Sequence, residues 1–263
     1  MLLRLIRNAT LLIDFAGRRL LVDPMLNPAG TVEPVVNTAN PRRNPLVDLP
    51  VPAENVIKGL DAVLVTHLHN DHFDALASDL LPKDLLVLCQ PDDVDRLVER
   101  GFHDVRPVEN QMEFDGIALV RTGGCHGTGE IGRRMGEVSG FVLRTAGEPT
   151  LYLVGDSIWC TPVETALDSH SPDVVVVNAG GARFLEGDRI VMDERDVIGA
   201  ARAIPGATVV AVHLEALNHC PVSRAGLRAH VEAAGLGDRV RIPIDGETLE
   251  FSLLSAAQMP ARS

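Results

Sequence analysis

Three histidines and an aspartate lie within six residues, directly after an apolar run that is typical of a buried strand. The run spans Asp61–Thr66, and the cluster consists of His67, His69, Asp71 and His72. Residues two apart on an extended segment face the same side, so His67 and His69 can converge on one ion. The chain must then turn, which lets Asp71 and His72 face a second ion beside the first. Because imidazole and carboxylate groups are ligands for zinc, manganese and iron, the cluster predicts a metal site at a strand end.

Four ligands cannot complete two metal sites, so the remaining ligands must come from elsewhere in the chain. A rigid sheet holds side chains best where its strands end. Three residues that follow strand-like runs fit this requirement: His126, Asp156 and His213. Asp23, which follows the run Arg19–Val22, is a further carboxylate at a strand end. His219 competes with His213 as the late ligand, but only His213 follows directly on an apolar strand.

Other metal and cofactor sites are disfavoured by the sequence pattern. The four cysteines are far apart and form no Cys-x-x-Cys pair, which argues against a disulfide framework and a cysteine-rich structural zinc site. Helical patterns over 91–100, 193–203 and 223–234 do not alternate strictly with strand-like runs. Since no Gly-x-Gly-x-x-Gly motif follows a first strand either, a dinucleotide-binding domain is disfavoured.

The ordered set of metal-binding candidates resembles the pattern of the metallo-β-lactamase superfamily of hydrolases. The match comprises His-x-His-x-Asp-His at 67–72, a downstream histidine at 126, Asp156 in a Gly-Asp step, and His213. The early Asp23, in Leu-Val-Asp-Pro, fits the same pattern, and the resemblance covers nearly the whole chain. It implies an α+β fold, the αββα sandwich, in which two mixed β-sheets pack face to face with helices on the outside.

The resemblance also implies a centre of two divalent metal ions, zinc by preference and manganese or iron as alternatives. One ion would be held by His67, His69 and His126. The other would be held by Asp71, His72 and His213. Asp156 would bridge the ions and Asp23 would orient their ligands. Asp71 would in addition be the catalytic residue that accepts the proton of the nucleophile.

Three stretches resemble, more narrowly, the branch of the superfamily that contains L-ascorbate-6-phosphate lactonase: 124–132, 155–160 and 213–220. This resemblance implies a hydrolase in which a metal-bridging hydroxide attacks a small ester or lactone, an anionic one included. Two alternatives stay open. One is a small-molecule phosphodiesterase, and the other is a non-catalytic metal-binding or sensor protein on the same fold.

Five further polar residues are candidates for substrate binding: Arg133, Arg134, Asn178, Glu215 and His219. The arginines are candidates because a guanidinium group suits a carboxylate or phosphate. Each residue also has a purely structural explanation. The charged side chains would then lie on the solvated surface, Asn178 would stabilise a turn, and His219 would cap a helix.

The charge balance limits the partners of the chain. It has 263 residues and a formal net charge of −12, from 24 Lys and Arg against 36 Asp and Glu. This balance argues against a broad basic face for a nucleic acid polymer or an anionic membrane, although a small anionic substrate stays compatible with it. No apolar window is long enough to span a bilayer, so we expect a cytoplasmic protein with a small-molecule substrate.

Residues 24–55 contain seven prolines and show little periodicity. A loop of this length inside a domain is usually functional or disordered. The residues before it are too few to form a domain of their own. We therefore expect one domain over 1–263, in which this Pro-rich segment is a lid, a pocket wall or an interface loop between copies in a homo-oligomer.

Overall fold

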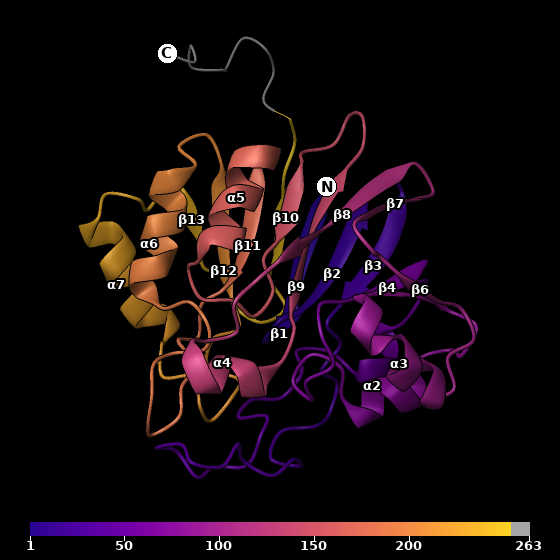
Figure 1. The fold of residues 1–263 in the computed structure, drawn as a ribbon, viewed down its shortest axis with the longest axis horizontal. Coiled ribbons are helices and arrows are strands. Elements are labelled where there is room, and N and C mark those ends of the chain that lie inside the picture. The colour runs from indigo at the N-terminus through magenta and orange to yellow at the C-terminus, as the bar shows by residue number, and fades with distance from the viewer. Residues whose placement is uncertain (254–263) are drawn as a thin grey trace.

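Two β-sheets lie face to face in the computed structural model, which describes residues 1–253 (Figure 1). Each sheet has seven strands. In pairing order, the first sheet consists of β14 (Thr248–Glu250), β1 (Leu2–Arg7), β2 (Thr10–Phe15), β3 (Arg18–Val22), β4 (Ala62–Val65), β5 (Leu86–Cys89) and β6 (Val105–Pro107). The second sheet consists of β13 (Val240–Arg241), β12 (Thr208–Val212), β11 (Val174–Asn178), β10 (Leu151–Leu153), β9 (Ser139–Arg144), β8 (Ile117–Gly123) and β7 (Gln111–Phe114).

Both sheets are mixed. In the first, β1, β2 and β3 pair antiparallel, and β3 to β6 pair parallel. In the second, β7 to β10 pair antiparallel, and β10 to β13 pair parallel. Because parallel strands present their carboxyl ends at one edge of a sheet, the loops after β3, β4, β10, β11 and β12 collect at shared edges.

Apolar side chains from both sheets form the core between them. Alternate residues of a strand face the same side, so Leu3 and Leu5 of β1 both point inward. They share one buried cluster with Leu64 of β4, Phe141 of β9 and Val176 of β11. The contact between the two sheets is therefore a dry hydrophobic layer, which holds the strand ends of both sheets in fixed relative positions.

Helices cover the outer face of each sheet (Figure 1). Against the first sheet pack α2 (Ala75–Leu80) and α3 (Val94–Glu99), the latter preceded by the 3-10 turn η1 (Pro91–Asp93). Against the second sheet pack α5 (Thr161–His170), α6 (Glu194–Ala203) and α7 (Arg224–Ala233). The layers confirm the α+β sandwich, two mixed sheets with helices outside, that the sequence pattern predicts.

The three predicted helices are present, and the residues that start them explain their bounds. The side chain of Asp193 accepts hydrogen bonds from the backbone at the start of α6, in a capping box with Asp196. Ser223 caps α7 through the backbone N–H of Gly226. Sequence patterns did not indicate α2, α5, α1 (Ala53–Val56) or α4 (Gly129–Met135). Most of these are short, so their apolar faces leave little periodicity to detect.

The Pro-rich segment 24–55 contains almost no regular structure, but it is anchored to the first sheet. Val32 and Asn44 form an isolated β-bridge, and α1 begins at the end of the segment. The fully buried Arg7 donates from Nη1 to the carbonyl of Val47 at 3.0 Å. Its Nη2 donates to the carbonyls of Met25 and Asn27 at 2.8 and 2.9 Å. The segment thus lies across one end of the sandwich, on the same side as α4 (Figure 1).

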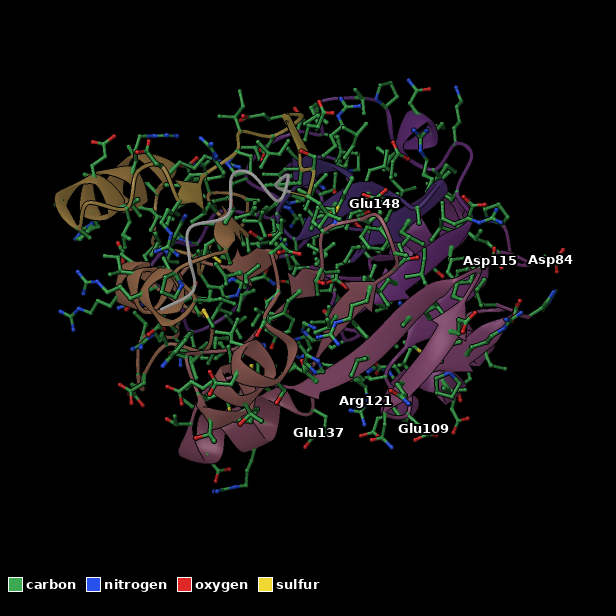
Figure 2. The ribbon with its side chains drawn as sticks, turned by 90° about the horizontal axis from the view of Figure 1, so that it is seen from above. Asp84, Glu109, Asp115, Arg121, Glu137 and Glu148 are labelled. Atoms are coloured by element: carbon green, nitrogen blue, oxygen red, sulfur yellow. The ribbon has the colours of Figure 1, made fainter. Side chains whose placement is uncertain are left out.

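Polar side chains also join the two sheets. Gln90, which follows β5, donates to the carbonyl of Glu137 at 3.1 Å and accepts from the hydroxyl of Ser139 at 2.9 Å. Arg18 of β3 pairs with Asp115, in the turn between β7 and β8, at 3.1 Å. Figure 2 labels Glu137 and Asp115 at separate places along the second sheet. These links fix how the sheets are aligned, because hydrogen bonds require particular partners whereas apolar packing does not.

Within residues 1–253, no helix combines the length and the apolar character that crossing a membrane requires.

Truncating an inward-facing side chain should destabilise the fold strongly. Leu143 of β9 is fully buried between the sheets, and Leu143→Ala should lower the free energy of unfolding by about 2–5 kcal/mol through lost burial and a residual cavity. The matched control is Leu185→Ala, because Leu185 is 64% exposed. Urea unfolding followed by circular dichroism measures both. Equal effects of the two changes would contradict the assigned core.

Candidate metal centre

The loops that carry the predicted ligands meet at the carboxyl ends of the strands. Asp23 follows β3, and the cluster 67–72 begins two residues after β4. His126, Asp156 and His213 follow β8, β10 and β12 of the second sheet. Contacts between these residues span both sheets, so the site lies where the two strand edges face each other. The positions are rigid because each loop leaves directly from a buried strand.

A first group of donors consists of His67, His69 and His126. One nitrogen from each lies within 4.8 Å of the other two. His67 Nε2 and His69 Nδ1 are 2.9 Å apart, and the rings of His69 and His126 have centroids 5.2 Å apart. The structure thus brings together the three imidazoles that the sequence pattern assigned to one ion.

A second group of donors consists of Asp71, His72, Asp156 and His213. His72 Nε2 lies 3.3 Å from Asp156 Oδ2, and His213 Nε2 lies 3.3 Å from Asp71 Oδ2. Ligands placed about 2.0–2.2 Å from a tetrahedral ion are roughly 3.3–3.6 Å from one another. The observed separations therefore fit donors arranged around a single cation.

Asp156 lies between the two groups. Its Oδ2 is 3.3 Å from His72 Nε2 in the second group and 3.6 Å from His126 Nε2 in the first. Its Oδ1 accepts a hydrogen bond of 2.7 Å from the amide of Asn178. A carboxylate in this position can face two cations at once, which is the arrangement that a bridging role requires.

Asp23 orients donors in both groups. Its Oδ2 is 2.8 Å from His72 Nδ1, which turns Nε2 of that ring toward the carboxylates of the second group. Thr66 donates its backbone N–H to Asp23 Oδ1 at 2.8 Å and its hydroxyl to Asp23 Oδ2 at 2.7 Å. The same hydroxyl is 3.1 Å from His67 Nδ1. One buried carboxylate thus fixes the ring orientation, and with it the free nitrogen, of two histidines.

Sequence patterns did not indicate several residues that support the donors. The side-chain amide of Asn8 donates from Nδ2 to the backbone carbonyl of Asp71 at 3.0 Å, and the backbone carbonyl of Asn8 accepts from the backbone N–H of His213 at 2.8 Å. His126 Nδ1 is 2.8 Å from the carbonyl of Ile190. Asn8 and His213 both have positive φ, at 58° and 63°, which non-glycine residues rarely adopt. Only the tertiary structure brings these loops together, so no local signal marks them.

The electrostatics of the site favour an unprotonated imidazole at His67 in the first group and a positive charge at His72 in the second. Burial lowers the pKa of His67 well below its ordinary value, and the imidazole of His72 lowers it further. Burial opposes the charged form of His72 as well, but the carboxylates of Asp156, Asp23 and Asp71 outweigh it and raise its pKa. Carboxylates that favour a positive charge at this place would also favour a metal cation.

The carboxylates of the second group are held in the ionised form. Burial by itself raises the pKa of Asp156, but the imidazoles of His72 and His213 hold it well below its ordinary value. The same two imidazoles lower the pKa of Asp71, against the effect of burial. Asp71 and Asp156 therefore both present negatively charged oxygens, the form in which a carboxylate binds a metal.

The donors fit divalent metal ions on three grounds. The ligand types are imidazole and carboxylate, which suit zinc, manganese and iron. In the second group, the separations of 3.3 Å from His72 to Asp156 and from His213 to Asp71 match the edges of a coordination shell. His72 Nε2 is buried and forms no hydrogen bond with any described residue, although Asp156 Oδ2 lies 3.3 Å away. A buried nitrogen that faces carboxylates without a hydrogen bond is suited to bind a cation instead.

The candidates for substrate binding lie in different surroundings. The side chain of Asn178 is buried against Asp156, so it positions a proposed ligand. Glu215 binds the backbone and the guanidinium of Arg224 at 2.8 and 2.7 Å. Arg133 pairs with Glu130 on the exposed surface of α4. Their roles toward a substrate stay predictions.

Arg134 and His219, the other two candidates, differ in burial. Arg134 is exposed on α4. His219 Nδ1 is buried and has no partner among the described residues, and burial lowers the pKa of the ring to about 4. His213 belongs to a donor group whereas His219 does not, as the position of His213 at a strand end predicted.

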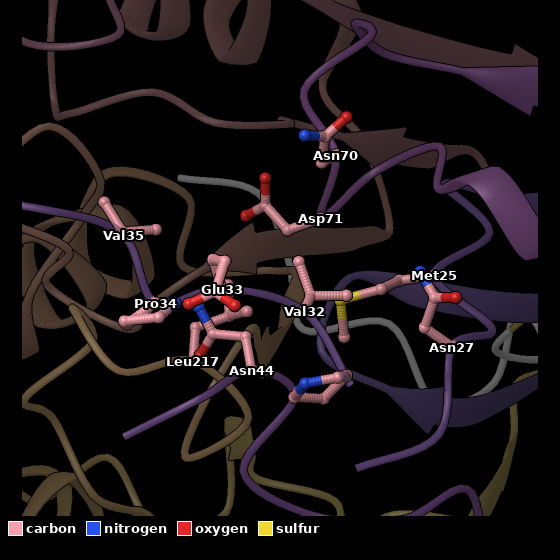
Figure 3. A pocket seen from close by; sticks show the side chains of 11 residues that line it. Met25, Asn27, Val32, Glu33, Pro34, Val35, Asn44, Asn70, Asp71 and Leu217 are labelled. Atoms are coloured by element: carbon pink, nitrogen blue, oxygen red, sulfur yellow. The ribbon is translucent and has the colours of Figure 1, made fainter. Parts of the chain in front are cut away.

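A cavity of about 220 Å³ opens beside Asp71. Figure 3 shows Asn70 and Asp71 at one side of it, with Val32, Asn44 and Leu217 facing Asp71. Most of its wall comes from the Pro-rich segment 24–55. None of the five substrate-binding candidates is among its lining residues.

Removing the charge of Asp23 should weaken metal binding while leaving the fold intact. In Asp23→Asn the carboxylate no longer holds His72 and the Thr66–His67 pair, so the affinity for zinc should fall about 10–100-fold. Competition with a chelating indicator measures this affinity. The matched control is Asp84→Asn, since Asp84 is 91% exposed and should bind zinc like the parent. Unchanged zinc affinity in Asp23→Asn would contradict the orienting role.

Comparisons with known proteins agree with this geometry. Residues 18–214 match the beta-lactamase superfamily domain. The UPF0173 protein YddR of Bacillus subtilis is 37% identical over 249 residues, which cover 94% of this chain and 98% of that protein. A UPF0173 metal-dependent hydrolase of Azorhizobium caulinodans is 26% identical, over 92% of this chain and 97% of that protein.

The comparison with solved structures likewise finds hydrolases. The crystal structure of an isothiocyanate hydrolase from Delia radicum gut bacteria superposes with a TM-score of 0.92 and 37% identity, over 96% of this chain and 100% of that chain. A possible metal-dependent hydrolase from Veillonella parvula superposes with a TM-score of 0.92 and 36% identity, over 95% and 98% of the two chains. The chain therefore belongs to the beta-lactamase superfamily and, within it, to the UPF0173 family of metal-dependent hydrolases.

Proposed function

We propose that the chain is a hydrolase with two divalent metal ions that attacks an electrophilic carbon in a small molecule. One observation carries the proposal: two adjacent donor groups share Asp156 as a neighbour, and Asp71 of the second group also lines a cavity. A purely structural metal site would be closed, whereas this one opens on a space that a small molecule can enter.

The two donor groups would hold the metal ions, zinc by preference and manganese or iron as alternatives. Bound there, divalent cations would polarise the electrophile and make water acidic enough to supply hydroxide near neutral pH. Asp71 is the residue best placed to orient the attacking water, because its carboxylate is ionised and lies at the cavity. Asn8 keeps Asp71 aligned with His213, and Asn178 keeps Asp156 in place.

An isothiocyanate is the first candidate substrate, because a structure 37% identical to this chain is that of an isothiocyanate hydrolase. In such a reaction, the oxygen of water adds to the central carbon of R–N=C=S, and the carbon–nitrogen bond then breaks. Both hydrogens of the water end on nitrogen, so the products are the amine R–NH₂ and carbonyl sulfide. For this reaction, the donors of the site need only present water to the central carbon of the isothiocyanate.

A small ester or lactone is the second candidate. It rests on the resemblance of 124–132, 155–160 and 213–220 to the L-ascorbate-6-phosphate lactonase branch, which stays a prediction. Esters and lactones likewise react by addition of water to an electrophilic carbon, so the same donors could serve.

A cytoplasmic location, the absence of nucleic acid and membrane partners, and a homo-oligomeric state also stay predictions.

A metal-dependent screen tests the proposal. The purified protein, stripped of metal and then reloaded with zinc, manganese or iron, is assayed on isothiocyanates, lactones, esters, thioesters and phosphodiesters. Turnover of a carbon electrophile should require metal and disappear with a chelator. Tight metal binding without hydrolysis of any member of the panel would favour the sensor alternative. Preferential turnover of phosphodiesters would favour the phosphodiesterase alternative.

Replacing donors of the second group should remove both metal and turnover. Asp156→Asn and His72→Ala should each lower the metal content, and should lower kcat/KM by more than the roughly 10–100-fold that is typical for residues which only orient ligands. His103→Ala is the control, because His103 is 71% exposed and far from the donors in the sequence. If metal content and turnover both survived in the donor variants, the two-metal proposal would be wrong.

A further inference from the structure

We propose that the cavity beside Asp71 binds an uncharged, largely apolar substituent of the substrate, no larger than about one six-membered ring. This inference rests on the proposed function and names the chemical class of its substrate. It concerns the part of the substrate that does not react.

The position of the cavity links it to the reaction. Asp71 belongs to the second donor group, where its Oδ2 is 3.3 Å from His213 Nε2, and it also lines the cavity. Asn70, its neighbour in the chain, lines the cavity as well. A substrate whose reacting carbon lies at the donors would therefore extend its substituent along Asp71 and into this space (Figure 3).

The wall is mostly apolar. Six of the eleven lining residues are apolar, namely Met25, Val32, Pro34, Val35, Pro45 and Leu217, and the other five are Asn27, Glu33, Asn44, Asn70 and Asp71. Asn44 also lines it, but its amide is already occupied: Nδ2 donates to Asn218 Oδ1 at 2.8 Å, and Oδ1 accepts from the backbone of Asn218 at 2.9 Å. Such a wall favours a group that gains from leaving water and needs few hydrogen bonds.

The charges near the cavity disfavour an anionic substituent. Among the described residues that line it, the charged side chains are the carboxylates of Asp71 and Glu33, and no cationic side chain lines it. Arg43 pairs with Glu33, but its Nε and Nη2 donate to the carbonyls of Gly30 and Thr31. An anion here would lose hydration without gaining a free cation. The sequence pattern left an anionic substrate open, and this wall argues against one.

The charge of Glu33 would also stabilise a cationic substituent only weakly. Its side chain is 78% exposed and already paired with Arg43, so its field is screened by water and partly neutralised. Asp71 belongs to the second donor group, where its Oδ2 lies 3.3 Å from His213 Nε2. The balance therefore favours an uncharged group.

The volume limits the size of this group. An apolar cavity of about 150 Å³ inside a protein can hold benzene. The cavity here, about 220 Å³, thus has room for a single ring or a short alkyl chain together with its connecting atoms.

The wall is held in place, so its shape can select substrates. The amide of Asn218 accepts from the backbone of Val35 at 3.0 Å and donates to the carbonyls of Val35 and Asn40 at 3.0 and 2.7 Å. It also donates to the hydroxyl of Thr38 at 2.8 Å. Asn218 lies five residues after His213, so the wall is tied to the loop that carries a proposed ligand. A wall fixed before binding needs little ordering when the substrate enters.

A binding experiment on the zinc-loaded protein tests the inference with three unreactive probes of similar size: benzyl alcohol, phenylacetate and benzyltrimethylammonium. The key variant is Val32→Phe, which fills the cavity from a half-buried position on its wall. The matched control is Val36→Phe, four residues away, where the side chain is 79% exposed and does not line the cavity. Ligand-observed NMR titration measures each dissociation constant.

Benzyl alcohol should bind to the parent and to Val36→Phe alike, and at least tenfold more weakly to Val32→Phe. For phenylacetate and benzyltrimethylammonium, only the binding that Val32→Phe weakens counts as binding in the cavity. This binding should be at least tenfold weaker than that of benzyl alcohol. Phenylacetate bound through zinc alone would be insensitive to Val32→Phe and so leaves the prediction for the cavity intact. Tighter, Val32-dependent binding of either charged probe would overturn the inference, as would benzyl alcohol binding that Val32→Phe does not change.

A charge variant gives a second measurement. Val32→Lys places an ammonium group at the wall and should reverse the preference, so that phenylacetate gains at least tenfold over its affinity for the parent. Val36→Lys should show no such gain. Equal effects of the two lysines would show that general surface charge, and not the cavity, decides binding.

The failure of this inference differs from the failure of the proposed function. If the parent hydrolyses benzyl isothiocyanate or a benzyl ester but Val32→Phe leaves KM unchanged, the cavity assignment is wrong and the hydrolase stands. If Val32 controls benzyl alcohol binding but no electrophile is hydrolysed in any metal form, the cavity stands and the hydrolase is wrong.

Discussion

A single buried carboxylate organises the centre of this structure. Asp23 is 2% exposed, and it receives the backbone N–H and the hydroxyl of Thr66 while lying 2.8 Å from His72 Nδ1. A buried carboxylate without such partners would be strongly unfavourable, so the loop after β4 must fold in the one way that supplies them. That same loop conformation turns His67 and His72 toward the other donors. The requirement to satisfy one charge therefore orients one histidine in each donor group.

The dry layer between the sheets makes this arrangement possible. The donors come from loops of both sheets, and their nitrogen and oxygen atoms lie within 4.8 Å of one another in each group. Small shifts of one sheet against the other would separate them. Because interiors are packed closely, the apolar cluster resists such shifts. Several imidazoles and carboxylates can thus be buried together, at a cost in stability that the large core offsets.

The sequence predicts functional residues that lie in a recognisable local pattern. It misses residues whose hydrogen-bond partners are distant in the chain. His67, His69 and His72 follow an apolar strand in a dense cluster, so the amino-acid sequence alone predicts their role as metal ligands. Asn8 and Asn218 are not among the predicted site residues, and their partners lie 63 residues or more away in the chain. Asn178 shows the intermediate case: its strand end indicated the site, but only the structure shows that its amide holds Asp156. A single sequence carries no signal for such distant pairings.

The Pro-rich segment shows how specificity and chemistry are separated in this chain. It shows little periodicity because it contains almost no helix or strand, and hydrogen bonds from Arg7 and Asn218 hold its shape. It supplies much of the cavity wall, yet it contributes none of the described metal-donor groups. Substitutions at Val32 or Val35 can therefore change the size and polarity of the cavity while the strand-end donors stay where they are. In this chain the proposed hydrolytic centre would then stay the same while the substituent that fits the cavity changes.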